Sequence, residues 1–426
     1  MKLWEKGIPT DQKIEQFTVG NDRELDVVLA KYDALGSIGH AKMLAEVGLI
    51  THNEATSLVA ALEEILISIE TDSFIIESNF EDVHSKIEYM LIEKLGDVGK
   101  KIHTARSRND QVLVDMHLYL KDEIITIKSL VKSLFDLLME LADKNKNILL
   151  PGYTHLQIAM PSSFGLWFSA YAESLIDDIS MLNAALKIVD QNPLGSAAGY
   201  GSSFPINRTF TTEALGFSTL KYNVVAAQMS RGKSEKTMAF AMNSVAATLS
   251  KLALDICLYL SQNFDFISLP GHLTTGSSIM PHKKNPDIFE LIRGKANKIQ
   301  SLPYELTLIT NNLPSGYHRD FQLLKEGLFP AIENLKSCLA MTQYAIQDIK
   351  VKETILNDKK YDYLFTVDSL NELVLQGIPF RDAYKIVAEQ LENGTFKAPE
   401  TTKHTHEGSI NNLCLKEIKE KMDNSF

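Results

Sequence analysis

The residues best suited to chemistry lie in one loop, Gly276–Pro286, which reads Gly-Ser-Ser-Ile-Met-Pro-His-Lys-Lys-Asn-Pro. It carries the hydroxyl of Ser277, the ammonium of Lys283 and the amide of Asn285 on one short segment. A serine takes a proton from carbon only when positive charge and hydrogen-bond donors stabilise its alkoxide. Lys283 can supply that charge or hold a substrate carboxylate. The alternative, a lysine-rich surface turn, explains the glycine and prolines but not the apolar Ile-Met pair. The loop can therefore place a nucleophile or a base beside a cation that holds a carboxylate.

A second polar segment, residues 103–111, reads His-Thr-Ala-Arg-Ser-Arg-Asn-Asp-Gln. The two arginines that flank Ser107 suit bidentate binding of a carboxylate. Ser107 or Asn109 could instead cap the long helix expected after this segment, with Asp110 in its first turn. Capping leaves the paired arginines unexplained, so both interpretations stay open.

A third segment, residues 151–157, reads Pro-Gly-Tyr-Thr-His-Leu-Gln, and we expect it to be a loop that enters a helix near Pro161. A lone histidine is more often structural than catalytic. If His155 acts in catalysis, proton transfer is its natural role, because histidine exchanges protons near neutral pH.

Two further candidates lie nearer the C-terminus. Glu290 should lie in the first turn of a helix, where it could orient a histidine from elsewhere or simply favour the helix N-terminus, and we weigh these readings equally. Residues 317–325 read Tyr-His-Arg-Asp-Phe-Gln-Leu-Leu-Lys, and we expect a helix to begin after Tyr317. A solvated charged helix is the alternative for this segment.

Long helices must position these segments. Apolar residues recur every three or four positions along one stretch: Leu113, Met116, Leu120, Ile124, Ile127, Val131, Leu134, Leu138 and Leu141. This spacing predicts a long helix packed lengthwise on others. A second such seam is formed by Val245, Leu249, Leu252, Ile256 and Tyr259. Further helices are expected over residues 163–189, 286–311 and 321–349, and alternating strand patterns are scarce. The sequence predicts a mainly α fold.

We divide the chain into an N-terminal helical part (1–103), a central long-helix bundle (104–352) and a small C-terminal helical part (353–426). The long helices are apolar on more than one side, which favours burial between subunits.

Composition limits the function. The chain has 426 residues with a net charge of −11, which argues against a nucleic-acid or anionic-membrane partner. Its N-terminus lacks an apolar signal core, and no run was found that approaches the roughly 18 residues of a membrane span. Three scattered cysteines fit reduced thiols. We therefore expect a cytoplasmic protein.

Two weaker motifs carry less weight. Residues 193–201, Pro-Leu-Gly-Ser-Ala-Ala-Gly-Tyr-Gly, lack the strand and spacing of a phosphate-binding loop, so we expect a close-packed turn near the active site or a helix connection. His404 and His406 have no companion ligands, so no metal site is expected there.

The Gly276–Pro286 loop resembles the signature of the fumarase/aspartase superfamily of lyases. Within it, residues 106–111 resemble the argininosuccinate lyase branch, with support from 36–38, 82–84, 151–157 and 291–295. The resemblance runs from about residue 15 to about 390. It implies cleavage of argininosuccinate to arginine and fumarate in arginine biosynthesis, without metal or organic cofactor. It also implies a homotetramer with a fumarase/aspartase-like helical core, in which each active site takes segments from three subunits.

The resemblance also implies roles for residues. Ser277 would remove the Cβ proton, Lys283 and Asn285 would stabilise the carbanion, and His155, oriented by Glu290 of another subunit, would assist proton transfer to the leaving nitrogen. Substrate-binding positions of the family match Asn109, Thr154, Asn285, Tyr317, Gln322 and Lys325, with Ser107 and Arg108 beside them.

The sequence departs from the family pattern at several positions. Ile158 and Met160 replace arginine and glutamine, Ala105 replaces glycine, and His282 replaces glutamine. Trp4–Gly7 is a reduced version of an N-terminal motif. Asp22 lies where a substrate-contacting serine is expected, and residues 230–233 read Ser-Arg-Gly-Lys in place of Ser-Asp-Arg-Asp.

Two alternatives remain. One is a sister lyase that acts on another fumarate adduct, such as an adenylosuccinate-like or a modified argininosuccinate-like substrate. Residues 106–111 argue against the adenylosuccinate-like (purine) substrate. The other is a structural protein that has kept the fold and lost activity, which predicts loss of Ser277, His155 or Lys283; all three are present.

Overall fold

The computed structural model describes residues 11–71, 73–399 and 403–426. The chain divides into two compact units. The first unit comprises residues 1–127, 181–243 and 299–333, and the second comprises 128–180, 244–298 and 334–426. The sequence-based division into 1–103, 104–352 and 353–426 is a different partition and stays a prediction.

Four long helices contribute residues to both units: α7 (Arg108–Lys144), α8 (Phe164–Val189), α11 (Lys233–Leu260) and α14 (Leu324–Ile346). The first unit also contains α1 (Gln12–Val19), α2 (Asp22–Asp26), α3 (Ala30–Glu46), α4 (His52–Glu70), α5 (Val83–Leu95), α6 (Asp97–Lys100), α9 (Arg208–Ala214), α10 (Val224–Gln228) and α13 (Leu302–Thr310). Its remaining elements are the 3-10 helices η1 (Val27–Leu29), η2 (Lys101–His103) and η4 (Arg319–Leu323) and the short strands β3 (Gln191–Asn192) and β4 (Thr219–Leu220).

The second unit adds α12 (Asp287–Ile299), α15 (Thr366–Leu375), α16 (Phe380–Glu392) and α17 (Leu415–Ser425). Its strands are β1 (Leu149–Thr154), β2 (Gln157–Ser163), β5 (Ile267–Ser268) and β6 (Lys350–Val351), and its 3-10 helices are η3 (Gly271–Leu273), η5 (Ile355–Asn357) and η6 (Lys359–Phe365). The mainly α fold predicted from the sequence is confirmed.

The helical seams predicted from the sequence are buried except at Tyr259, which is half-buried. Every residue of the α7 seam from Leu113 to Leu141 is buried, and so are Val245, Leu249, Leu252 and Ile256 of α11. In the first unit α7 packs on α14 through the rings of Tyr119 and Phe329, whose centroids lie 4.9 Å apart. In the second unit Asp255 of α11 accepts hydrogen bonds from Trp167 and Tyr171 of α8. These contacts hold the long helices against one another within each unit.

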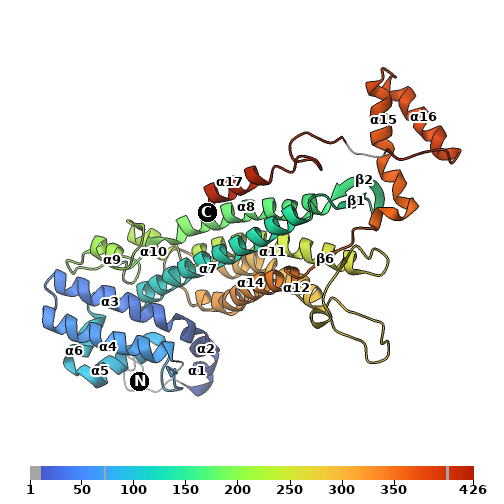
Figure 1. The fold of residues 1–426 in the computed structure, drawn as a ribbon. Helices are drawn as coiled ribbons and strands as arrows, with labels where there is room; N and C mark the ends of the chain where they lie inside the picture. The colour runs from blue at the N-terminus through green and yellow to red at the C-terminus, as the bar shows by residue number, and fades with distance from the viewer. Residues whose placement is uncertain (1–10, 72, 400–402) are drawn as a thin grey trace. The chain divides into compact units, whose positions relative to one another are not determined.

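The first unit has its own core. Helices α3, α4 and α5 lie side by side (Figure 1) and bury Leu44, Leu58, Leu62, Ile87 and Leu91 between them. In the second unit α15 packs on α16 around Leu370, Ala383 and Val387.

Three local expectations were wrong. Residues 149–163 form an antiparallel hairpin, not a loop, and α8 begins only after it, at Phe164. The helix expected over 286–311 is two helices, α12 and α13, because the chain turns at 300–301 and a proline follows in the first turn of α13. The helix expected from residue 321 begins as the 3-10 turn η4, and α14 starts at Leu324.

Helix α11 also corrects the sequence analysis. By length and composition it could cross a membrane, with a mean hydropathy of 1.2 over its most apolar window. A core helix of a soluble bundle passes the same test. The most apolar window of α11 is 44% buried inside the chain, and Met238, Met242 and Val245 of the helix are buried. One helix of this kind does not by itself indicate a membrane protein.

Candidate functional site

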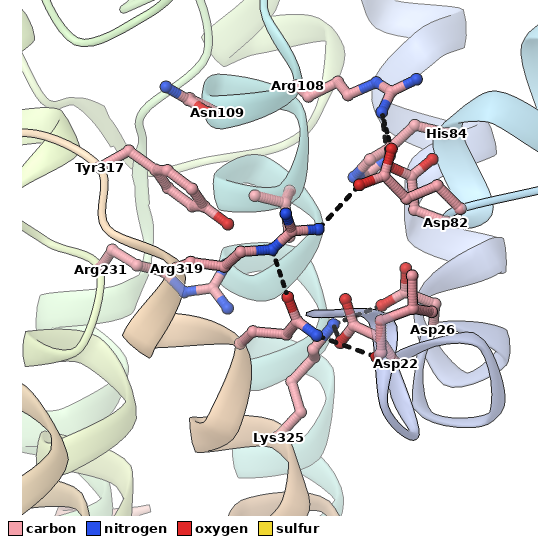
Figure 2. A pocket seen from close by; sticks show the side chains of 14 residues that line it. Asp22, Asp26, Asp82, His84, Arg108, Asn109, Arg231, Tyr317, Arg319 and Lys325 are labelled. Carbon is pink, nitrogen blue, oxygen red and sulfur yellow. Dashed lines mark hydrogen bonds and ion pairs between the residues drawn. The ribbon is translucent and has the colours of Figure 1, made fainter. Parts of the chain in front are cut away.

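A cavity of about 270 Å³ in the first unit collects most of the predicted substrate-binding residues. Arg108, Asn109, Tyr317 and Lys325 line it (Figure 2), and Gln322 lines it too. Helix α7 supplies the first two, and the segment that leads through η4 into α14 supplies the others. The two segments are distant in sequence, and the fold of the first unit brings them to one pocket.

Sequence reasoning missed the acidic lining of this pocket. Asp22, Asp26, Glu81 and Asp82 line it beside the cations. Of these four, the sequence analysis names Asp22 as a departure from the family pattern and Asp82 as part of the matching segment 82–84, and it gives neither a role in the pocket. No local pattern marks these carboxylates, because their partners are distant in the chain.

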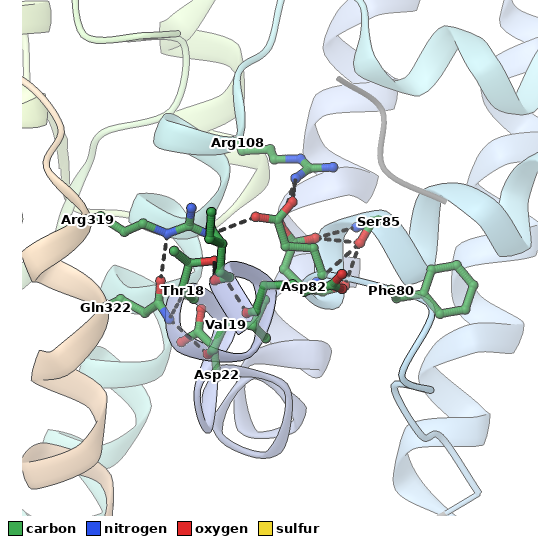
Figure 3. A network of polar contacts seen from close by, with 12 residues as sticks. Thr18, Val19, Asp22, Phe80, Asp82, Ser85, Arg108, Arg319 and Gln322 are labelled. Carbon is green, nitrogen blue, oxygen red and sulfur yellow. Dashed lines mark hydrogen bonds and ion pairs between the residues drawn. The ribbon is translucent and has the colours of Figure 1, made fainter. Parts of the chain in front are cut away.

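The cations at the mouth of the pocket are paired with these carboxylates. Arg108 donates to Asp82 at 3.0 Å and to Glu81 at 3.3 Å, and Arg319 donates to Glu81 at 2.8 Å. Asp82 also caps α5 through a reciprocal capping box with Ser85 (Figure 3). The guanidinium of Arg108 is therefore held in position by a residue that the α5 cap itself fixes.

Gln322 forms hydrogen bonds with the last residues of α1. Its amide donates to the carbonyls of Thr18 and Val19 at 3.1 and 3.0 Å, and its oxygen accepts from Arg319 at 3.3 Å (Figure 3). Thus the amide of Gln322 makes internal hydrogen bonds in this structure.

Lys325 is buried, with its ammonium between two carboxylates. It donates to Asp26 at 2.5 Å and forms an ion pair with Asp22. Burial alone would lower the pKa of Lys325, but Asp26 and Asp22 outweigh it and raise that pKa. Burial and the neighbouring Asp26 raise the pKa of Asp22 to about 6.

The structure shows whether Ser107 and Asp110 stabilise the start of α7, the alternative that the sequence left open. Ser107 Oγ accepts from the backbone N–H of Asn109 at 3.2 Å, and Asp110 accepts from that of Ser107 at 2.9 Å. Asp110 also accepts from Gly195 and Ala197, so residues 193–201 form a close-packed turn held against α7. Ser107 and Asp110 thus have structural roles, whereas Asn109 faces the pocket.

The signature loop 276–286 belongs to the second unit. Its base is closed by the backbone pair Thr275 and Asn285, with hydrogen bonds of 3.2 and 2.8 Å. The Oγ of Ser277 accepts from the N–H groups of Ile279 and Met280, at 3.4 and 3.2 Å. Lys283 is exposed and forms no ion pair with any described residue. The loop therefore presents a hydroxyl that receives two donors and an ammonium available to an anion.

His155 lies at the tip of the β1–β2 hairpin. His155 and Leu156 form its two-residue turn, between the paired Thr154 and Gln157, and have φ values of 54° and 58°. Left-handed backbone at both central positions is typical of a type I′ turn, which usually takes Asn-Gly. This conformation is strained for leucine. Thr154 and His155 are exposed at this tip, and Glu290 is exposed in the first turn of α12.

A buried cluster behind the pocket resembles a metal site in composition. The ligand atoms of Asp33, His84 and Asp115 lie within 4.8 Å of one another. Burial opposes a charge on His84, but Asp33 and the other carboxylates raise its pKa to about 9. In this structure His84 forms a buried ion pair with Asp33, whose carboxylate oxygen lies 3.1 Å from its Nδ1.

The departures from the family pattern fall into different places. Ala105, where the family has glycine, has φ 62°, a conformation that glycine adopts without strain. Asp22 and Arg231 both line the pocket. Trp4–Gly7 lies outside the described residues.

Comparison with known proteins decides the family. The family described as "Lyase" matches residues 5–301. The argininosuccinate lyase of Bacteroides fragilis (strain ATCC 25285) is 57% identical over 417 residues, which cover 98% of this chain and 93% of that protein. The argininosuccinate lyase of Thermotoga neapolitana is 41% identical over 91% of this chain and 98% of its own length. This chain belongs to the argininosuccinate lyase family.

Solved structures agree with the fold. An EDDS lyase variant with bound fumarate superimposes with a TM-score of 0.77 at 20% identity and covers 98% of this chain and 90% of its own. A "fumarate lyase:delta crystallin" from Brucella melitensis, bound to cobalt, gives 0.76 at 18% identity, over 98% of this chain and 97% of its own. At such identities the likeness concerns the fold alone.

Proposed function

We propose that this protein cleaves argininosuccinate to arginine and fumarate by β-elimination, in arginine biosynthesis. The observation that carries the proposal is the identity of 57% with an argininosuccinate lyase over nearly the whole length of both chains. The chemistry of the pocket supports it. Argininosuccinate carries three carboxylates, an ammonium and a guanidinium, so a pocket that binds it needs charges of both signs, as this one has.

In our proposal the substrate-binding surface consists of the eight residues predicted from the sequence: Ser107, Arg108, Asn109, Thr154, Asn285, Tyr317, Gln322 and Lys325. Arg108 and Lys325 attract carboxylates, and Tyr317 and Asn109 supply hydrogen bonds. Gln322 supplies one when its amide leaves the carbonyls of Thr18 and Val19. Ser107 contributes through the cap that fixes Asn109.

Ser277 acts as the base. Its Oγ takes the Cβ proton, the electron pair of the C–H bond moves into the adjacent carboxylate, and the C–N bond to the guanidinium then breaks. The N–H groups of Ile279 and Met280 point at this oxygen and favour its anionic form. Lys283 and Asn285 stabilise the negative charge on the substrate carboxylate.

His155 assists protonation of the leaving guanidinium nitrogen. We propose that Glu290 of another subunit orients it, in a homotetramer with shared active sites. Exposed apolar side chains on the long helices support such an assembly: Ile125, Phe240, Leu254, Met341 and Tyr344. Light scattering on the purified protein tests it, and a monomeric mass would contradict it. A cytoplasmic location is part of the same proposal.

A substrate panel tests the function. Fumarate absorbance is followed with argininosuccinate, adenylosuccinate and malate in parallel. Release from argininosuccinate alone is expected. Turnover of another adduct instead would keep the lyase assignment and change the substrate. No fumarate from any of the three would favour a structural protein with this fold.

A further inference from the structure

The ammonium of Lys325 is already neutralised inside the protein. Its side chain is only 3% exposed and lies between Asp26 and Asp22, which line the same pocket. Figure 2 shows the lysine nitrogen directed at both carboxylates. Two negative charges therefore face one positive charge at the place where a substrate carboxylate should bind.

The two carboxylates are held differently. Asp26 accepts from Lys325 and also from the backbone N–H of Val83 at 3.3 Å, and its side chain is 3% exposed. Asp22 is 16% exposed, and its Oδ1 has no hydrogen-bond partner of good geometry beyond the ion pair with Lys325. Asp26 is fixed from two sides, whereas Asp22 is the carboxylate that can change its state.

The other charged groups nearby do not neutralise the excess negative charge of Asp22 and Asp26. Arg231 is the other cation that acts on Asp22, but it is paired with Glu235 at 2.8 Å. The remaining charged groups of the pocket, Glu81, Asp82, His84, Arg108 and Arg319, are engaged in ion pairs of their own. A substrate carboxylate at Lys325 would thus be the third carboxylate around one ammonium, and like charges at this distance in a buried site are costly.

We propose that Asp22 is a proton-linked competitor for Lys325: it occupies the ammonium in the free enzyme, and a substrate carboxylate reaches Lys325 only as Asp22 takes up a proton. This inference rests on the proposed function, because it assumes that the pocket binds argininosuccinate. It makes Asp22 a residue that sets the pH dependence of substrate affinity.

The direction of the effect follows from linkage. Burial and Asp26 raise the pKa of Asp22 to about 6 in the free enzyme. Below that pH Asp22 is already protonated, and KM is lowest. Above it each binding event must take up a proton, so KM rises with pH by up to about tenfold per pH unit, the limit for a single proton.

The experiment measures KM for argininosuccinate from pH 6 to pH 8 in the wild type, Asp22→Asn and Asp22→Ser. Asp122→Asn is the matched control, because Asp122 also pairs with a lysine, Lys31, but on the exposed surface of the first unit. Calorimetry of argininosuccinate binding to Ser277→Ala, in two buffers of different ionisation enthalpy, counts the protons taken up. The same titration is repeated with Asp22→Asn added to that background.

We expect the wild type and Asp122→Asn to show the rise in KM and both Asp22 variants to show a flat profile, with a lower KM than wild type at pH 8. Proton uptake near neutral pH should disappear with Asp22→Asn. A rise in KM that persists in the Asp22 variants, or a KM at pH 8 above that of the wild type, would overturn the inference while leaving the proposed function intact. A wild type that releases no fumarate from argininosuccinate would overturn both.

Discussion

Asp110 anchors the start of α7, and its replacement tests whether this residue is structural. Its carboxylate is fully buried and accepts from the backbone N–H groups of Ser107, Gly195 and Ala197 at 2.9, 3.0 and 2.8 Å. Asp110→Ala removes the acceptor of all three groups at once. Each buried N–H without an acceptor costs about 1–3 kcal/mol. Ser107 and Ala197 are only half-buried, so water can partly replace the carboxylate there.

We therefore expect Asp110→Ala to lower the free energy of unfolding by about 3–5 kcal/mol. Asp110→Asn keeps one oxygen of similar position and loses one acceptor, which predicts a smaller loss of about 1–2 kcal/mol. Burial raises the pKa of Asp110 despite its donors, so the lost charge itself should cost little.

The assay is urea unfolding followed by circular dichroism, at one fixed protein concentration because oligomers unfold in a concentration-dependent way. The control Asp122→Asn removes the charge of the exposed pair with Lys31 and keeps an oxygen that can accept from the Tyr32 hydroxyl, so it should change stability by no more than about 1 kcal/mol. If Asp110→Ala unfolds at the same urea midpoint as the wild type, the structural interpretation of Asp110 is refuted. Loss of activity without loss of stability would assign Asp110 to the chemistry instead.

Three further predictions concern other residues. Burial opposes a charge on His84, yet Asp33 raises its pKa to about 9, so its stabilisation is complete below pH 6.5 and is lost as the pH rises through 9. That decline amounts to about 3 kcal/mol in the free energy of unfolding, and His84→Gln should remove it from the urea unfolding curves; an unchanged decline would contradict this. Ala105→Gly should leave the protein equally stable or up to about 1 kcal/mol more stable in urea, because φ is 62° there, and a clear loss would count against the strain argument. His155→Asn should lower kcat more than it raises KM in the fumarate assay, and an effect on KM alone would make His155 a positioning residue.

The sequence predicts the parts of this fold that depend on local periodicity. The α7 seam from Leu113 to Leu141 is buried as expected, because a three-to-four spacing marks one face of a helix wherever that helix packs. The hairpin at 149–163 was missed for a local reason. Its turn uses His155 and Leu156 in left-handed conformations where asparagine and glycine would have given a recognisable signal.

The site was predictable only in part. Residue type points to carboxylate binding for Arg108, whereas Asn109 and Lys325 were expected to bind substrate only from the family resemblance; the first unit brings the three to one pocket. Their acidic partners were not predictable, because Asp22 and Lys325 lie about 300 positions apart and no local pattern links them. The roles of Ser277, His155, Lys283 and Glu290 stay predictions.

The proposed reaction is tested most directly by measuring how much arginine and fumarate the wild type and Ser277→Ala form from argininosuccinate. We expect equimolar arginine and fumarate from the wild type, and a folded Ser277→Ala variant whose rate is lower by orders of magnitude. Wild-type protein that forms neither product would contradict the proposed reaction, and near-normal turnover by Ser277→Ala would remove Ser277 from the mechanism.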